Sequence, residues 1–175
     1  MKIGLLSDTH SYLDQRIFEY FASCDEIWHA GDIGAAFLAD ALEKFKPLRA
    51  VYGNIDDPVI RKKFPEDNWF TCEGMTILIT HIAGAPPHYN PRIKRLLAER
   101  KPDILVTGHS HILRVVRDKK YDMMYFNPGA AGNQGFHHMK TLLRFEINGK
   151  EVSNMEVIEL GRRGSLTGSE PIPEN

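Results

Sequence analysis

Apolar residues in the first third of the chain alternate between short continuous runs and segments with helical spacing. Residues 2–7, 26–30 and 48–52 are apolar runs that end in a polar or glycine-containing segment, a pattern typical of buried strands. Between them, residues 12–24 and 35–45 carry apolar side chains at roughly helical spacing. This part of the chain therefore predicts alternating strands and helices.

The rest of the chain predicts mainly strands, and we find no internal repeat. The expected elements are a hairpin of residues 69–72 and 75–80, a helix that begins with proline over residues 91–100, a buried strand over residues 104–107, and strands over residues 113–117, 123–127, 141–147 and 152–160. Turn signals such as Asn148-Gly149 separate the last four runs, so we expect this half to be mostly antiparallel.

The order of these elements predicts an α/β fold. Each sheet must bury an apolar face, so we expect two mixed β-sheets packed face to face and flanked by helices, a four-layer αββα sandwich. A chain of 175 residues suits one domain, which we place at residues 1–160. Residues 161–175 are rich in Gly, Ser, Pro and charge, and we expect a flexible tail there.

Composition narrows the range of partners. The chain has 22 basic and 23 acidic residues, and its net charge of -1 gives no electrostatic basis for binding a nucleic-acid polymer or a membrane surface. The apolar runs are too short for a signal peptide or a membrane span, which favours a cytoplasmic protein. Trp69, Phe70 and Tyr125 are candidate contacts of a homo-oligomer, or else belong to the core.

Polar clusters stand where five of the predicted strands end. Ligands bind at the carboxyl ends of strands in open α/β sheets, so clusters that are distant in sequence can converge there. Together the clusters offer two Asp, one Asn and four His as ligands: Asp8, His10, Asp32, Asn54, His81, His109 and His111.

This set of donors predicts a site for two divalent ions. Oxygen and imidazole ligands without thiolate suit ions such as Mn, Fe, Zn or Ni, and seven ligands exceed the needs of one ion. Two ions about 3.5–4 Å apart that share a carboxylate can generate a hydroxide near neutral pH and stabilise an in-line phosphoryl displacement. Asp32 is the natural bridging residue.

Each cluster also has an ordinary explanation when taken alone. Asp8-Thr9-His10 resembles a helix N-cap, and Gly31-Asp32 and Gly53-Asn54 are common turn dipeptides. Gly108-His109-Ser110-His111 is more informative, because two histidines directly after a buried strand are unusual unless both bind something.

The order and spacing of the clusters resemble the calcineurin-like metallophosphoesterases, whose motifs are written DxH, GD, GN, H and GHxH. The short chain, Ser7-Asp8-Thr9-His10 and Asn127-Pro128-Gly129 are similar to the small YfcE-type phosphodiesterases, and the resemblance covers roughly residues 1–160. It implies a phosphoesterase, with a phosphodiesterase favoured over a monoesterase, that acts on a small phosphate ester through a hydroxide bridging two metals. Mn is the favoured ion, and Ni, Zn, Fe or Mg are alternatives.

Carried onto this sequence, the resemblance implies a first metal held by Asp8, His10, Asp32 and His111. The second metal would be held by Asp32, Asn54, His81 and His109. Asp32, Asn54 and His109 would then act in catalysis through the metals that they hold.

Other residues near these motifs need separate interpretations. Many larger relatives have a histidine where this chain has Ile55, and isoleucine cannot transfer a proton, so an activated leaving group is favoured. Asp56 is interpreted either as a carboxylate that orients the ligands or as a turn or cap residue before Pro58. His29 is expected to pack or to form hydrogen bonds, and a solvated loop is favoured for His137, His138 and His88.

Two other functions compete with small-ester hydrolysis. A non-catalytic protein-binding scaffold of the Vps29 type shares the implied fold, but it has no physical need for four histidines at strand ends. A nuclease would use the same metals, but the near-neutral charge argues against a long polymer. The basic stretch Arg92-Ile93-Lys94-Arg95 is better explained as a solvated helix face.

Overall fold

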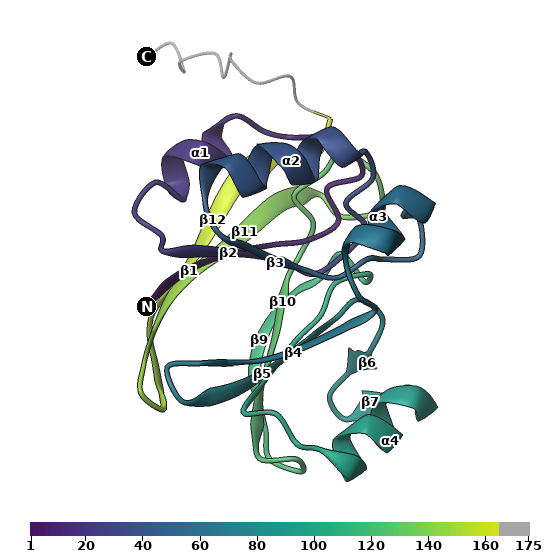
Figure 1. The fold of residues 1–175 in the computed structure, drawn as a ribbon, viewed down its shortest axis with the longest axis vertical. Helices are drawn as coiled ribbons and strands as arrows, with labels where there is room; N and C mark the ends of the chain where they lie inside the picture. Colours follow the sequence, from purple (N-terminus) through teal and green to yellow (C-terminus); the bar gives the residue numbers. More distant parts are fainter. Residues whose placement is uncertain (165–175) are drawn as a thin grey trace, which may run out of the picture.

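Two five-stranded sheets form the centre of the computed structural model, which describes residues 1–164 (Figure 1). The first sheet contains, in spatial order, β12 (Glu151–Arg162), β11 (Met139–Asn148), β1 (Lys2–Leu6), β2 (Glu26–His29) and β3 (Leu48–Ala50). The second contains β4 (Asp67–Cys72), β5 (Met75–Thr80), β8 (Ile104–Val106), β10 (Met123–Pro128) and β9 (Leu113–Asp118). A small ribbon pairs β6 (Gly84–Ala85) with β7 (His88–Tyr89).

Both sheets are mixed, as predicted. In the first, β1 runs parallel to β2 and antiparallel to β11. In the second, β5 runs parallel to β8 and antiparallel to β4. The strands that follow β8 pair mostly antiparallel, in the hairpins β9–β10 and β11–β12.

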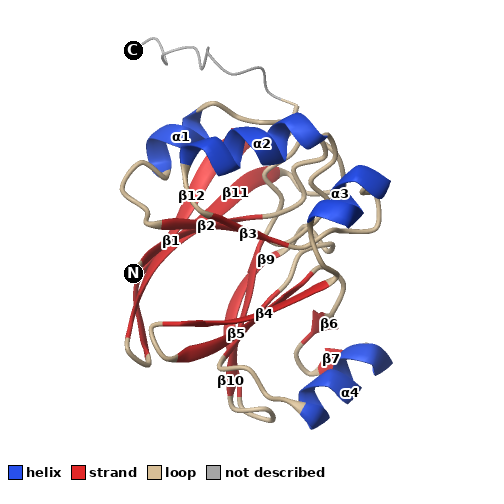
Figure 2. Ribbon diagram, viewed as in Figure 1, coloured by secondary structure: helices blue, strands red, loops and turns tan. Residues whose placement is uncertain are grey.

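Helices cover the outer faces of the two sheets, which gives the predicted α/β sandwich of four layers (Figure 2). The helices are α1 (Arg16–Tyr20), α2 (Ala36–Phe45), α3 (Pro58–Lys63) and α4 (Pro91–Glu99). The first two lie over the first sheet, and α4 lies over the second. The buried face of α2 carries Leu38, Ala39 and Leu42, of which Leu38 and Leu42 are one helical turn apart.

The layer between the sheets is apolar and rich in aromatic residues. Trp28 packs edge-on against Phe70 and Phe145, and Phe126 also packs against Phe145.

A separate core lies under α4. It contains the buried Tyr125, and the partly buried Trp69 packs against it. The three aromatic residues considered for an oligomer surface therefore pack in this chain's own cores.

The helix predicted over residues 12–24 is confined to α1. Ser11 has a left-handed backbone and donates its N–H to the carbonyl of Ile33, so the chain after His10 is attached to the neighbouring loop. Asp14 is buried and bonds to Arg16, which fixes the entry to α1. Residues 12–15 therefore form a loop that is held in place by these contacts. The helical spacing of their apolar residues does not reveal this loop.

The sequence interpretation missed α3, although its N-terminal signal is present. Asp57 caps the helix by accepting hydrogen bonds from Val59 N and Ile60 N, and Pro58 occupies the first turn. At the other end of the chain, β12 runs two residues past the predicted domain boundary at residue 160. Residues 165–175 of the predicted tail lie outside the described residues. None of the helices described here has the length and apolar character needed to cross a bilayer.

Candidate metal centre

The seven predicted ligands converge where the carboxyl ends of the two sheets meet. Each follows a strand of the parallel part of its sheet, so the topology brings together side chains that are far apart in sequence. Asp8 and His10 follow β1, Asp32 follows β2, Asn54 lies beyond β3, His81 follows β5, and His109 and His111 lie beyond β8.

One group of ligand atoms comes from Asp8, His10 and His111, whose atoms lie within 4.8 Å of one another. The Nε2 atom of His111 is 3.1 Å from Oδ1 of Asp8 and 3.3 Å from Nε2 of His10. These contacts place one carboxylate and two imidazoles around one point, as the first metal would require.

A second group comes from Asp32, His81 and His109, again within 4.8 Å of one another. The Nε2 atom of His81 is 3.3 Å from Oδ2 of Asp32 and 3.2 Å from Oδ1 of Asn54. Asn54 therefore joins this group.

Asp32 lies between the two groups. Its Oδ2 atom is 3.3 Å from Nε2 of His81 and 3.7 Å from Nε2 of His10, so one carboxylate oxygen faces an imidazole from each group. Its other oxygen accepts a hydrogen bond from Ile55 N at 3.0 Å. Asp32 is therefore placed between the two groups and is held there by a backbone donor.

The chemistry of the donors fits divalent cations. The Nδ1 atom of His81 is 2.7 Å from the carbonyl of Ala30, and a carbonyl only accepts, so Nδ1 carries a proton whether or not the ring is charged. Nε2 faces Asp32, to which it donates when protonated, and it is the nitrogen that would bind a cation after losing that proton. Burial disfavours the charged form of Asp32, yet the hydrogen bond and charge of His81 hold the pKa of this carboxyl below its ordinary range. Asp32 is thus ionised in a buried site, where a cation would stabilise it.

The backbone at the site is held in an uncommon conformation. A positive φ in a residue other than glycine is uncommon and costs on the order of 1–3 kcal/mol, and such residues cluster at functional sites. Five of the seven predicted ligands have one: Asp8, His10, Asp32, His109 and His111.

Two glycines are required by close approach. A Cβ at Gly53 would overlap Oδ1 of Asp32, and a Cβ at Gly108 would overlap Oγ of Ser7. Both positions therefore need glycine for a steric reason that a simple turn would not impose.

Asp56 ties together the loops that carry Asp32 and Asn54. Its buried carboxylate accepts hydrogen bonds from Gly53 N at 2.7 Å, Gly34 N at 2.6 Å and Ile33 N at 3.2 Å. Of the two interpretations given from the sequence, the structure favours support of the ligand loops, because the neighbouring Asp57 is the helix cap.

Asn127 holds the loop of His109 and His111. Its Nδ2 donates to the carbonyl of Gly108 at 2.8 Å and to Oγ of Ser110 at 3.1 Å, and its Oδ1 accepts from Gly129 N. The sequence interpretation used this residue only as part of the family resemblance.

His29 packs in the interior and forms hydrogen bonds next to the ligand loops, as predicted. It is fully buried, its Nδ1 accepts from Gly31 N at 3.2 Å, and its Nε2 lies 3.0 Å from Oγ1 of Thr9. Burial lowers the pKa of His29 from 6.5 to about 3. The folded protein therefore holds this imidazole neutral.

This neutral histidine should make the fold sensitive to acid. Below pH 6.5 the unfolded chain binds a proton that the folded chain refuses until about pH 3, so stability is lost as pH falls through that window. We expect His29→Asn to be less stable than the wild type at pH 7 but to lose about 3 kcal/mol less between pH 7 and pH 4. Urea unfolding of the chelator-stripped proteins measures the free energy of unfolding at each pH. If wild type and variant lose the same stability between pH 7 and pH 4, the protonation of His29 is not the cause of the acid sensitivity.

His137 differs from the solvated residue that the sequence predicted. It is half-buried, and its Nδ1 lies 3.2 Å from Nδ1 of His111. His88 and His138 are exposed, as expected. Ile55 stands 45% exposed at the rim of the site, where it offers only its backbone N–H.

Comparison with known proteins finds that this chain is similar to phosphoesterases. A model of the calcineurin-like phosphoesterase superfamily domain matches residues 1–150. A probable metallophosphoesterase of Methanothermobacter thermautotrophicus is 30% identical over 135 residues, covering 74% of this chain and 77% of that protein. A protein of Methanocaldococcus jannaschii named a phosphodiesterase is 26% identical over 145 residues, covering 74% of this chain and 83% of that protein.

A solved structure of Vps29 from Entamoeba histolytica, complexed with zinc, has a TM-score of 0.71 and 17% sequence identity. The match covers 91% of this chain and 99% of that chain. At this level of identity the comparison shows that the two proteins share a fold.

Proposed function

The chain belongs to the calcineurin-like phosphoesterase superfamily, and we propose that it hydrolyses small phosphate diesters at the centre formed by the seven strand-end side chains. The observation that carries this proposal is the position of Asp32, whose Oδ2 atom faces His10 in one ligand group and His81 in the other. A carboxylate placed in this way could serve two ions, and the relative named a phosphodiesterase supports the choice of reaction.

Each residue has a defined part in this proposal. Asp8, His10 and His111 would hold one ion, Asn54, His81 and His109 the other, and Asp32 both, with Mn the preferred ion. When bound, two divalent ions supply an activated water as nucleophile and stabilise the charge that develops on the phosphate oxygens. Asn54 and His109 are the exposed members of the set, so they lie on the side that a substrate would approach.

A cavity beside the second group provides room for the organic part of a diester. It has a volume of about 440 Å³ and is lined by Asn54 and His81 together with Tyr52, Ile82, Arg61 and Arg92. This volume falls in the range of small-molecule sites. Its lining combines apolar residues with Arg61, Arg92 and Glu66, so it can take an ester group with both apolar and polar parts.

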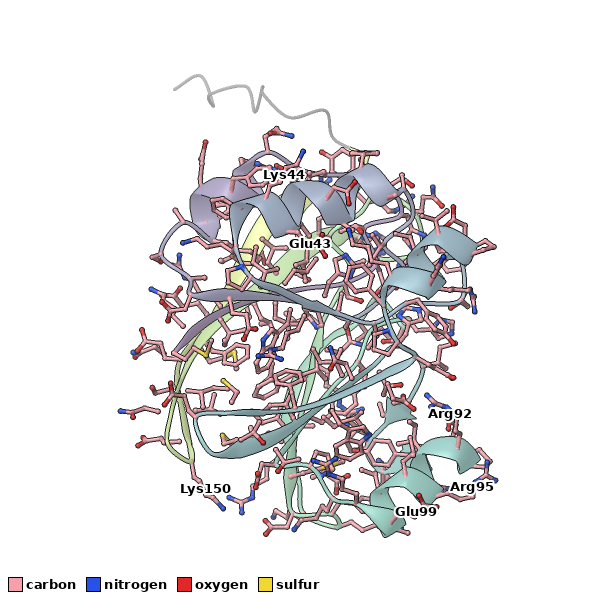
Figure 3. The ribbon with its side chains drawn as sticks, in the orientation of Figure 1. Glu43, Lys44, Arg92, Arg95, Glu99 and Lys150 are labelled. Atoms are coloured by element: carbon pink, nitrogen blue, oxygen red, sulfur yellow. The ribbon has the colours of Figure 1, made fainter. Side chains whose placement is uncertain are left out.

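Arg92 belongs to this cavity and not to a solvated helix face. Arg92 lies in the first turn of α4 (Figure 3), and its guanidinium donates to Asp67 on β4 and to Thr80 on β5. The rest of the basic stretch, Lys94 and Arg95, is exposed, which agrees with the interpretation from the sequence. Arg92 is therefore held in a fixed position in the wall of the cavity.

Ile55 sets an expectation for the leaving group. Because its side chain cannot donate a proton, departure of the alcohol must be driven by the alcohol's own acidity or by water. We therefore expect turnover to depend steeply on the pKa of the leaving group, with p-nitrophenolate among the best.

The test compares bis-p-nitrophenyl phosphate with p-nitrophenyl phosphate on the Mn-loaded protein. We expect kcat/KM to be at least about tenfold higher for the diester, a difference of about 1.4 kcal/mol in transition-state stabilisation. A higher value for the monoester would replace the diesterase with a monoesterase. Absence of turnover on both would favour the competing scaffold of the Vps29 type.

A further inference from the structure

The loop between β10 and β11 carries a histidine that contacts a predicted metal ligand. The rings of His137 and His111 have centroids 5.1 Å apart, and their Nδ1 atoms are separated by 3.2 Å. A hydrogen bond between two facing nitrogens requires that one of them carry the proton and the other accept it.

A second contact decides which nitrogen donates. The Nε2 atom of His137 is 3.0 Å from the carbonyl oxygen of Gly132, and a carbonyl can only accept. Nε2 of a neutral His137 therefore carries the proton, and its Nδ1 is the acceptor. It follows that His111 donates through Nδ1, which leaves the lone pair of its Nε2 free.

The free lone pair of His111 points into the site. Its Nε2 is 3.1 Å from Oδ1 of Asp8 and 3.3 Å from Nε2 of His10. An imidazole lone pair and a carboxylate oxygen at that separation repel each other unless a cation lies beside them. The contact with His137 thus selects the tautomer of His111 that a metal needs.

Gly132, whose carbonyl accepts from His137, is held in place by the residues that follow β1. Ala131 N donates to the carbonyl of Ser7 at 2.9 Å, and Gly132 N donates to the carbonyl of Asp8 at 3.0 Å. Gly135 lies against the ring of His111, where a Cβ would overlap Nδ1. The same loop therefore positions both the backbone of Asp8 and the ring of His111.

We propose that His137 is a positioning residue that fixes the tautomer and ring orientation of His111 and so strengthens cation binding by Asp8, His10 and His111. The inference rests on the proposed dimetal function, but it concerns binding of the ion and not turnover. Outer partners of metal-binding histidines typically contribute about 10–100-fold in metal affinity. The effect should fall on one of the two ions.

The experiment measures Mn²⁺ and Co²⁺ binding to the full chain after chelator treatment, by calorimetry and by the visible absorption of Co²⁺. We expect His137→Leu to weaken one of two binding events about 10–100-fold and to change the Co²⁺ spectrum of that event. His137→Asn places an oxygen acceptor near the position of Nδ1 and should restore much of the affinity. His138→Ala, at the exposed neighbour in the same loop, is the matched control and should bind both ions as the wild type does.

Equal affinity of His137→Leu, His138→Ala and wild type for both ions would overturn the inference, provided that circular dichroism shows all three folded. If His137→Leu fails to fold, the comparison of His137→Asn with His137→Gln decides, because the longer amide misplaces the acceptor and should bind more weakly. Equal binding by these two would also overturn it. Wild-type protein that binds two ions but hydrolyses no phosphate ester would contradict the proposed function and leave this inference standing.

Discussion

Replacing Asp32 with Asn should reduce phosphoester hydrolysis by more than about 1,000-fold, because the ion-dependent stabilisation that this carboxylate supports is worth several kcal/mol. Asp32 faces both ligand groups through Oδ2, so the loss of its charge weakens both at once. The amide keeps an oxygen that can accept from Ile55 N, so the fold should be preserved. Initial rates on bis-p-nitrophenyl phosphate at saturating Mn measure the effect.

The matched control for this variant is Asp57→Asn. Asp57 lies near the site and is exposed, and Asn caps a helix as well as Asp does. This control should keep full activity. Activity of Asp32→Asn within tenfold of the control would mean that Asp32 is not the shared ligand.

Replacing Asp56 with Ala should lower the free energy of unfolding by about 3–5 kcal/mol, because it leaves the N–H groups of Ile33, Gly34 and Gly53 without their acceptor. The same change frees the loops that carry Asp32 and Asn54, so metal affinity should fall with stability. Urea denaturation followed by circular dichroism measures the stability.

Its neighbour again provides the comparison. Asp57→Ala removes an exposed helix cap and should cost only about 1 kcal/mol. Asp56→Asn retains one acceptor oxygen and should fall between the two. If Asp56→Ala were no less stable than Asp57→Ala, the carboxylate of Asp56 would not be the tie between the two ligand loops.

The sequence predicted the sheets and the positions of the polar clusters well, because both depend on local signals. Strands such as Ile104–Val106 are continuous apolar runs, and of the two histidines that follow this strand, His109 is exposed and His111 only partly buried. The family match over residues 1–150 confirms the resemblance drawn from these motifs. The fold class follows from the same runs, since two apolar sheets must cover each other.

The sequence could not predict the parts that depend on tertiary contacts. The helical spacing of residues 12–24 gives no sign that Ser11 is bonded to Ile33, which shortens α1. The role of His137 depends on a loop folding back onto His111, a contact across 26 positions in sequence. The positive φ of His109 and His111 likewise becomes visible only in three dimensions. By contrast, α3 was missed although Asp57-Pro58 announces its start.

In the proposed function, two ions held by these seven side chains carry out phosphoester hydrolysis. The most direct measurement is a titration of chelator-stripped wild-type protein with Mn²⁺, in which hydrolysis of bis-p-nitrophenyl phosphate is followed as a function of added metal. We expect no turnover without metal and a rise that levels off at two equivalents per chain. Turnover that persists in the stripped protein, or absence of turnover with Mn, Ni, Zn, Fe and Mg alike, would contradict it.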